Sequence, residues 1–207
     1  DETLGAPLTR LCFEGPDDEL MATRNAQPAL LTHGAAVWAT VADRVRPHVR
    51  AAAGHSLGEF TAYHAAGSFT FSDALRLVRR RGELMFESGA KRPGAMAAIL
   101  GLSEANVEAA CTRALEVGDV VPANYNTPEQ LVISGEVAAV ERAMAIAKEL
   151  GAKRAIRLNV SGAFHSPLME EAAEGLKAAL DAAPIASTDF PVYSKVSTYP
   201  SARSSDS

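Results

Sequence analysis

The segment Gly54-His55-Ser56-Leu57-Gly58 constrains the fold of this chain more than any other feature. The short apolar run 48–53 before it predicts a buried strand, and residues 59–66 after it have the pattern of a helix. A serine in a G-x-S-x-G turn between a strand and a helix is typical of a nucleophile elbow, which lifts the hydroxyl clear of the backbone. The alternative interpretation is a tight packing turn in which Ser56 caps the helix.

Helical and extended patterns alternate along the rest of the chain, which predicts an α/β fold. Further helices are expected over 29–45, 72–88, 103–116, 137–150 and 166–183. Further strands are expected over 96–100, 120–124, 130–134, 153–160 and 190–196. Within 94–159 the order is β-α-β-β-α-β, a ferredoxin-like unit, so we expect a small domain there and a larger one from 1–93 and 160–207.

Composition excludes several classes of protein. The chain has 20 Lys and Arg against 25 Asp and Glu and no basic block, so we expect neither a nucleic-acid nor a membrane partner. No apolar run approaches the ~20 residues that span a bilayer, and the first residues do not have the pattern of a signal peptide. Two cysteines, Cys12 and Cys111, suit free thiols in a reducing compartment, so we expect a cytoplasmic protein.

A serine nucleophile needs a base, and the chain has five histidines. His165 lies at an expected strand-to-helix crossover, where a side chain can project into a cleft; the alternative is a capping or surface histidine. His33 lies in an apolar helix and is expected in the core, and His55 adjoins Ser56 and should point elsewhere. His48 and His64 have no distinguishing context.

The helix expected from Ser72 contains three consecutive arginines, Arg79-Arg80-Arg81. By helical phase, Arg81 falls at the edge of the apolar stripe and can reach inward. Arg80 falls on the solvent side, and a solvated face is the expected place for both Arg79 and Arg80. Asn124, Asn126 and Gln130 form a polar cluster that we expect either to line a cleft or to shape a turn.

Four segments, in the right order and spacing, resemble the malonyl-CoA:acyl carrier protein transacylase family and the related acyltransferase domains of polyketide and fatty acid synthases. They are Thr23-Arg24-Asn25-Ala26-Gln27-Pro28-Ala29-Leu30, Gly54-His55-Ser56-Leu57-Gly58-Glu59, Gly94-Ala95-Met96-Ala97-Ala98-Ile99 and Gly162-Ala163-Phe164-His165-Ser166. The resemblance implies an α/β-hydrolase-like large subdomain with a parallel sheet, and an inserted ferredoxin-like subdomain. It also implies an [acyl-carrier-protein] S-malonyltransferase of fatty acid or polyketide synthesis, with malonyl-CoA and acyl carrier protein as partners and without cofactor or metal.

The resemblance also assigns roles to residues. Ser56 is then the nucleophile and His165 its base, and Leu57 donates its backbone N–H to the oxyanion. Arg81, in Arg81-Gly82-Glu83-Leu84-Met85, binds the malonate carboxylate, and Leu57 and Phe164 bear on the acyl group, in the form found in malonyl-selective members.

The chain departs from the family pattern at both ends, because a first strand with a Gly-Gln-Gly motif and a further C-terminal third are expected but not found. Two other functions stay open. One is a serine hydrolase or thioesterase of lipase or patatin type, for which neither Asp73 nor Asp119 has a suitable context. The other is a non-catalytic remnant that binds acyl carrier protein.

Overall fold

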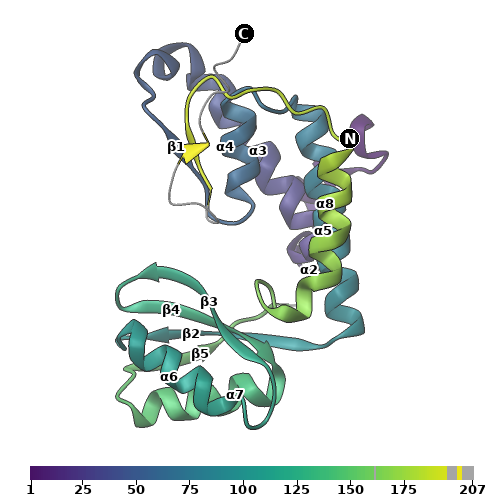
Figure 1. The fold of residues 1–207 in the computed structure, drawn as a ribbon. Coiled ribbons are helices and arrows are strands. Elements are labelled where there is room, and N and C mark those ends of the chain that lie inside the picture. The colour runs from purple at the N-terminus through teal and green to yellow at the C-terminus, as the bar shows by residue number, and fades with distance from the viewer. Residues whose placement is uncertain (161, 195–199, 202–207) are drawn as a thin grey trace. The chain divides into compact units, whose positions relative to one another are not determined.

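The computed structural model describes residues 1–160, 162–194 and 200–201 (Figure 1). It divides into two compact units, one of residues 1–83 and 176–207 and one of residues 84–175. Helices α5 (Phe71–Lys91) and α8 (Glu170–Asp181) each contribute residues to both units. The predicted limits of the small domain, 94–159, stay a prediction.

The first unit is mostly helical. Its first elements are η1 (Glu2–Leu4), α1 (Leu8–Glu14), α2 (Asp17–Met21), α3 (Thr23–Val45), η2 (Arg46–His48) and α4 (Gly58–Ala65). Its sheet has the order β1-β6-β7, from β1 (Ala52–Ala53), β6 (Val192–Tyr193) and β7 (Pro200–Ser201). Strands β1 and β6 are parallel, which agrees with the predicted α/β class.

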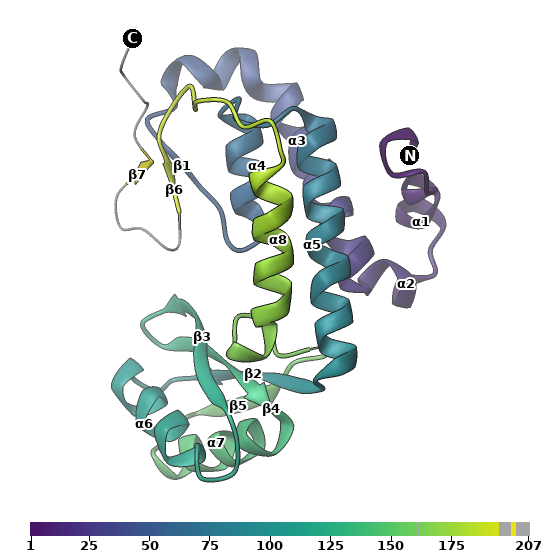
Figure 2. The same ribbon diagram turned by 45° about the vertical axis from the view of Figure 1, so that its right-hand side comes forward.

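The core of this unit lies between α3 and α5. Leu31 of α3 and Val78 of α5 are fully buried, and Leu75 joins them. Leu180 of α8 packs against the same cluster, and α8 lies beside α5 in both views (Figures 1 and 2). Fully burying one such side chain contributes about 1.5–3 kcal/mol, so this cluster stabilises the packing of α3, α5 and α8.

Two expectations for this unit are wrong. Among the described residues, the run 48–53 is not a buried strand, because pairing there is confined to Ala52–Ala53 and Ala53 is exposed. Pro47 lies within η2 and fixes a turn there, and the charged Arg50 faces solvent. His33 is exposed rather than buried, because α3 buries a narrow stripe at Gln27, Pro28, Leu31 and Ala35.

The second unit has the predicted β-α-β-β-α-β order. Its elements are β2 (Gly94–Leu100), α6 (Glu104–Ala114), β3 (Val120–Thr127), β4 (Gln130–Glu136), α7 (Val137–Glu149), β5 (Arg154–Arg157) and η3 (Pro167–Met169). The sheet order is β3-β4-β2-β5 with antiparallel neighbours throughout, as in a ferredoxin-like unit. Helices α6 and α7 cover one face of this sheet (Figure 1).

The other face of this sheet carries a smaller apolar cluster. Met96, Ala98 and Val132 are buried there, and the ring of Phe164 packs against them.

Asn126 lies within β3, and the turn that follows this strand is Pro128–Glu129, so a turn-forming role for Asn126 is excluded. The part of strand 190–196 beyond residue 194 lies outside the described residues. In the described part of the chain, no helix is both long and apolar enough to cross a membrane.

Candidate active site

Ser56 lies on the tight turn between β1 and α4. Its φ is 54°, in the left-handed region that non-glycine residues rarely adopt. A Cβ at Gly54 would lie 1.9 Å from the carbonyl carbon of Gly58, so the turn closes only with glycine at position 54. Gly58 is different, because a Cβ there would meet nothing within 4 Å. The turn therefore has the strain and the close approach that a nucleophile elbow requires.

The start of α4 supplies backbone donors beside Ser56. The N-cap of α4 is Leu57, without a side-chain cap, which excludes Ser56 as the capping residue. Gly58 donates its N–H to the carbonyl of His55, and Glu59 donates to the carbonyl of Ser56. Among the described residues no acceptor faces the N–H of Leu57. This donor is available to an oxyanion, in the role that the resemblance gives it.

Arg81 reaches the elbow from α5. Its Nη2 donates to Ser56 Oγ at 2.9 Å, and its Nη1 donates to Oε1 of Gln27 on α3. Gly82 permits this approach, because a Cβ there would lie 2.8 Å from Cα of Arg24 and from the carbonyl oxygen of Thr23. The close crossing of α3 and α5 therefore places the guanidinium between a buried amide and the serine hydroxyl.

The surroundings of Arg81 combine burial with one opposing charge. Burial lowers the pKa of the Arg81 guanidinium from its ordinary value, and the Glu59 carboxylate opposes that change. The guanidinium carbon lies 6.0 Å from the ring centroid of Phe60, within cation–π range. An arginine stays protonated in such a site, so a half-buried positive charge adjoins Ser56. In the described part of the chain, no group of three His, Cys, Asp or Glu side chains is arranged to hold a metal ion.

Gln27 also belongs to the site, although its sequence position alone did not predict this. Its side chain is 5% exposed, and its Nε2 donates to Thr23 Oγ1 at 3.0 Å. This bond leaves the amide oxygen to accept from Arg81. The available signal was a polar residue on the buried stripe at the start of a long apolar helix.

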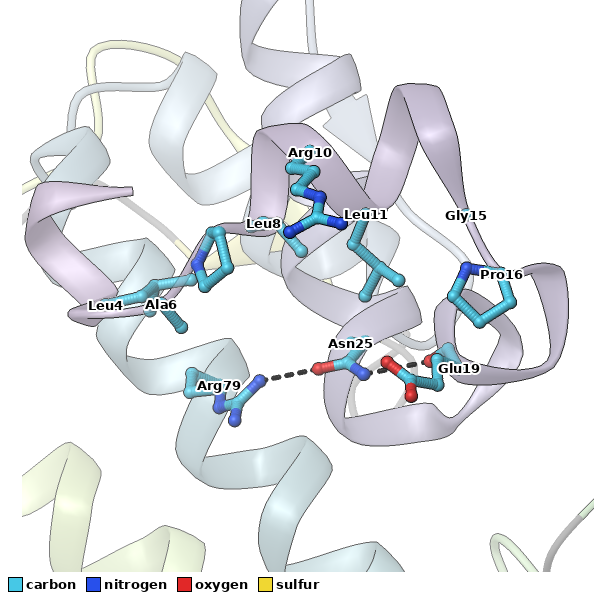
Figure 3. Close-up of a pocket in the computed structure, with 11 residues that line it drawn as sticks. Leu4, Ala6, Leu8, Arg10, Leu11, Gly15, Pro16, Glu19, Asn25 and Arg79 are labelled. Atoms are coloured by element: carbon cyan, nitrogen blue, oxygen red, sulfur yellow. Dashed lines mark hydrogen bonds between the residues drawn. The ribbon is translucent and has the colours of Figure 1, made fainter.

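The expectation that Arg79 lies on a solvated face is wrong. Its Nε donates to Glu83 at 2.8 Å, and its Nη1 donates to Oδ1 of Asn25 at 2.8 Å (Figure 3). Arg79 borders a cavity of about 380 Å³ that is lined mainly by α1 and its neighbours and not by Ser56 or Arg81. Arg80 is exposed, as predicted, with Nη1 3.8 Å from Glu83.

His165 and Phe164 belong to the second unit. His165 has a φ of 61°, so it also carries backbone strain, and its side chain is half-buried. Ser166 fixes the turn, because its Oγ donates to the carbonyl of Ala163 at 2.7 Å and accepts from the N–H of Leu168. Ser56 and His165 lie in different units, and their pairing stays a prediction. That Asn124 and Gln130 line a cleft also stays a prediction; Asn124 is half-buried.

The fold and the elbow define a class: α/β proteins with a serine on a strained strand-to-helix turn and a charged donor on its hydroxyl. The model of the acyl transferase domain family matches residues 1–206. The chain therefore belongs to the acyl transferase domain family.

Individual relatives show which acyl transferases this chain is similar to. A malonyl CoA-acyl carrier protein transacylase of Bacillus subtilis (strain 168) is 50% identical over 199 residues, which make up 95% of this chain and 62% of the relative. A crystal structure of malonyl-CoA:acyl carrier protein transacylase from Xanthomonas oryzae pv. oryzae has a TM-score of 0.92 at 40% identity, covering 98% of this chain and 65% of that one.

A second similar structure is a malonyl-transacylase in complex with a type II polyketide acyl carrier protein. Its TM-score is 0.87 at 41% identity, and the match covers 92% of this chain and 62% of that one. The chain thus spans a little under two thirds of the length of these relatives.

Proposed function

We propose that this chain carries the site that moves a malonyl group from malonyl-CoA to the phosphopantetheine thiol of acyl carrier protein. The observation that supports this most is the guanidinium of Arg81 on Ser56 Oγ. A malonyl group differs from an acetyl group by one carboxylate. A half-buried planar cation beside the nucleophile can recognise that carboxylate through two parallel hydrogen bonds.

The reaction has two half-steps. In the first, Ser56 Oγ forms a bond to the thioester carbonyl carbon and loses its proton to His165, which acts as general base. The C–S bond then breaks, the thiolate of CoA takes that proton, and malonyl-Ser56 remains. In the second half-step the carrier protein's thiol gives its proton to His165 and attacks the ester carbonyl; the C–O bond to Ser56 then breaks, and Ser56 Oγ takes that proton from His165. The N–H of Leu57 stabilises the oxyanion of both tetrahedral intermediates.

The remaining assignments follow the relatives. Their names include acyl carrier protein, and one solved complex contains such a carrier. We propose the same acceptor here, a place in fatty acid or polyketide synthesis, and a cytoplasmic location. Phe164, on the loop before His165, is proposed to contact the acyl group together with Leu57.

A thioester mixing assay tests this function. The chain is incubated with malonyl-CoA and holo-acyl carrier protein, and the products are separated by mass. Malonyl-carrier protein that forms with the chain and not with its Ser56→Ala variant supports the proposal. Release of free malonate by the chain with no carrier product would instead identify a hydrolase. No turnover, with carrier protein still bound, would identify a non-catalytic binding module.

A further inference from the structure

We infer that Arg81 restrains Ser56 in the substrate-free protein, and that the carboxylate of the acyl group releases this restraint when it binds. The inference rests on the proposed function and adds a mechanism of selectivity to it. It starts from a contact within one unit, the 2.9 Å hydrogen bond from Arg81 Nη2 to Ser56 Oγ. A donor on Oγ engages the oxygen lone pairs that must attack the thioester carbon, and a charged donor draws more electron density than a neutral one.

The surroundings fix the guanidinium in this position. Gln27 accepts from Nη1, Thr23 holds the Gln27 amide in place, and the ring of Phe60 lies on a face of the guanidinium group. The Glu59 carboxylate adds attraction for the cation from α4. Arg81 is therefore held beside Ser56 before any acyl group arrives.

A bound carboxylate competes for the same nitrogen. Each edge of a guanidinium that can hold a carboxylate through two parallel N–H groups includes Nη2. Such a charge-assisted pair is about twice as strong as a hydrogen bond between neutral groups, so the carboxylate draws Nη2 from the Ser56 hydroxyl. Ser56 Oγ then regains a lone pair next to the thioester carbonyl that the same substrate carries.

The consequence is a second layer of selectivity. An acetyl group lacks the carboxylate, so it meets a serine that is still engaged by Arg81. A malonyl group both binds the guanidinium and frees the nucleophile. The protein therefore discriminates in the acylation rate as well as in binding.

The test supplies the carboxylate separately from the acyl group. The chain is mixed with p-nitrophenyl acetate, an uncharged ester that acetylates Ser56 and releases p-nitrophenolate, with and without formate. Formate is small enough to occupy the fork of Arg81. We expect formate to raise the burst rate constant at saturating ester by about 2- to 10-fold, the range set by one net hydrogen bond. Chloride at the same ionic strength should have no such effect.

Variants supply the matched controls. Arg81→Ala should show the higher burst rate without formate and should not respond to it. Arg80→Ala, an exposed neighbour, should respond as the unchanged chain does. Equal or slower acetylation of the unchanged chain in formate overturns the inference, and malonyl transfer in the mixing assay would then still stand. If Ser56 is acylated neither by p-nitrophenyl acetate nor by malonyl-CoA, the proposed function itself is overturned.

Discussion

Replacement of Arg81 by alanine should change the choice of acyl group more than it changes the fold. The guanidinium donates hydrogen bonds to Gln27 and Ser56, and a hydrogen bond to a charged group contributes about 1.5–3 kcal/mol. That range corresponds to roughly 10- to 150-fold in relative rate. We expect Arg81→Ala to lower the ratio of kcat/KM for malonyl-CoA to kcat/KM for acetyl-CoA by this factor. Transfer of acetyl groups should be unchanged or faster.

Two further variants sharpen this measurement. Arg81→Lys should restore only part of the ratio, because an ammonium group cannot offer two parallel donors to a carboxylate. Arg80→Ala is the matched control, since Arg80 is exposed and lies on the same helix. If Arg81→Ala lowers both kcat/KM values equally while the variant stays folded, the reasoning about the carboxylate is refuted and Arg81 has a structural role.

Three other predictions follow from single residues. His165→Ala should slow acylation of Ser56 by roughly 10²- to 10⁴-fold in a stopped-flow assay, because this is the usual contribution of a general base. His33→Ala, at an exposed position, should leave the rate unchanged. Equal losses of rate in the two variants would refute His165 as the base. The hydroxyl of Ser134 is buried and has no hydrogen-bond partner in the described part of the chain. Ser134→Ala should therefore leave the free energy of unfolding, measured in urea, unchanged or raise it by up to about 1 kcal/mol. A clear decrease in this free energy would show that the hydroxyl has a partner. Burial raises the pKa of the Cys111 thiol to about 12. Iodoacetamide at about pH 8 should therefore alkylate the exposed Cys12 and not Cys111 until the chain is unfolded. Labelling of both cysteines in the folded protein would contradict this prediction.

Sequence patterns predicted the elements that have strong periodicity. The helix expected over 72–88 is part of Phe71–Lys91, and the β-α-β-β-α-β order of the second unit is present as expected. Helical phase also predicted that Arg81, rather than Arg80, would reach inward. These features depend on local spacing, which a sequence displays directly.

Contacts between distant segments were not predictable in the same way. Gln27 and Arg81 are 54 positions apart, and their contact depends on the close crossing of α3 and α5 at Gly82. A run of three arginines predicts a solvated face for Arg79, but α3 supplies Asn25 as a partner for it. The run 48–53 is apolar enough for a strand, yet among the described residues it pairs only at Ala52–Ala53, because Pro47 fixes a turn just before it.

The proposed function depends on transfer of the malonyl group to Ser56. Intact-mass analysis after incubation with malonyl-CoA, followed by tryptic mapping, measures this transfer. We expect a single malonyl adduct on the peptide that contains Ser56, and no adduct in the Ser56→Ala variant. An adduct on Ser166 or another residue, with the Ser56 peptide unmodified, would contradict it.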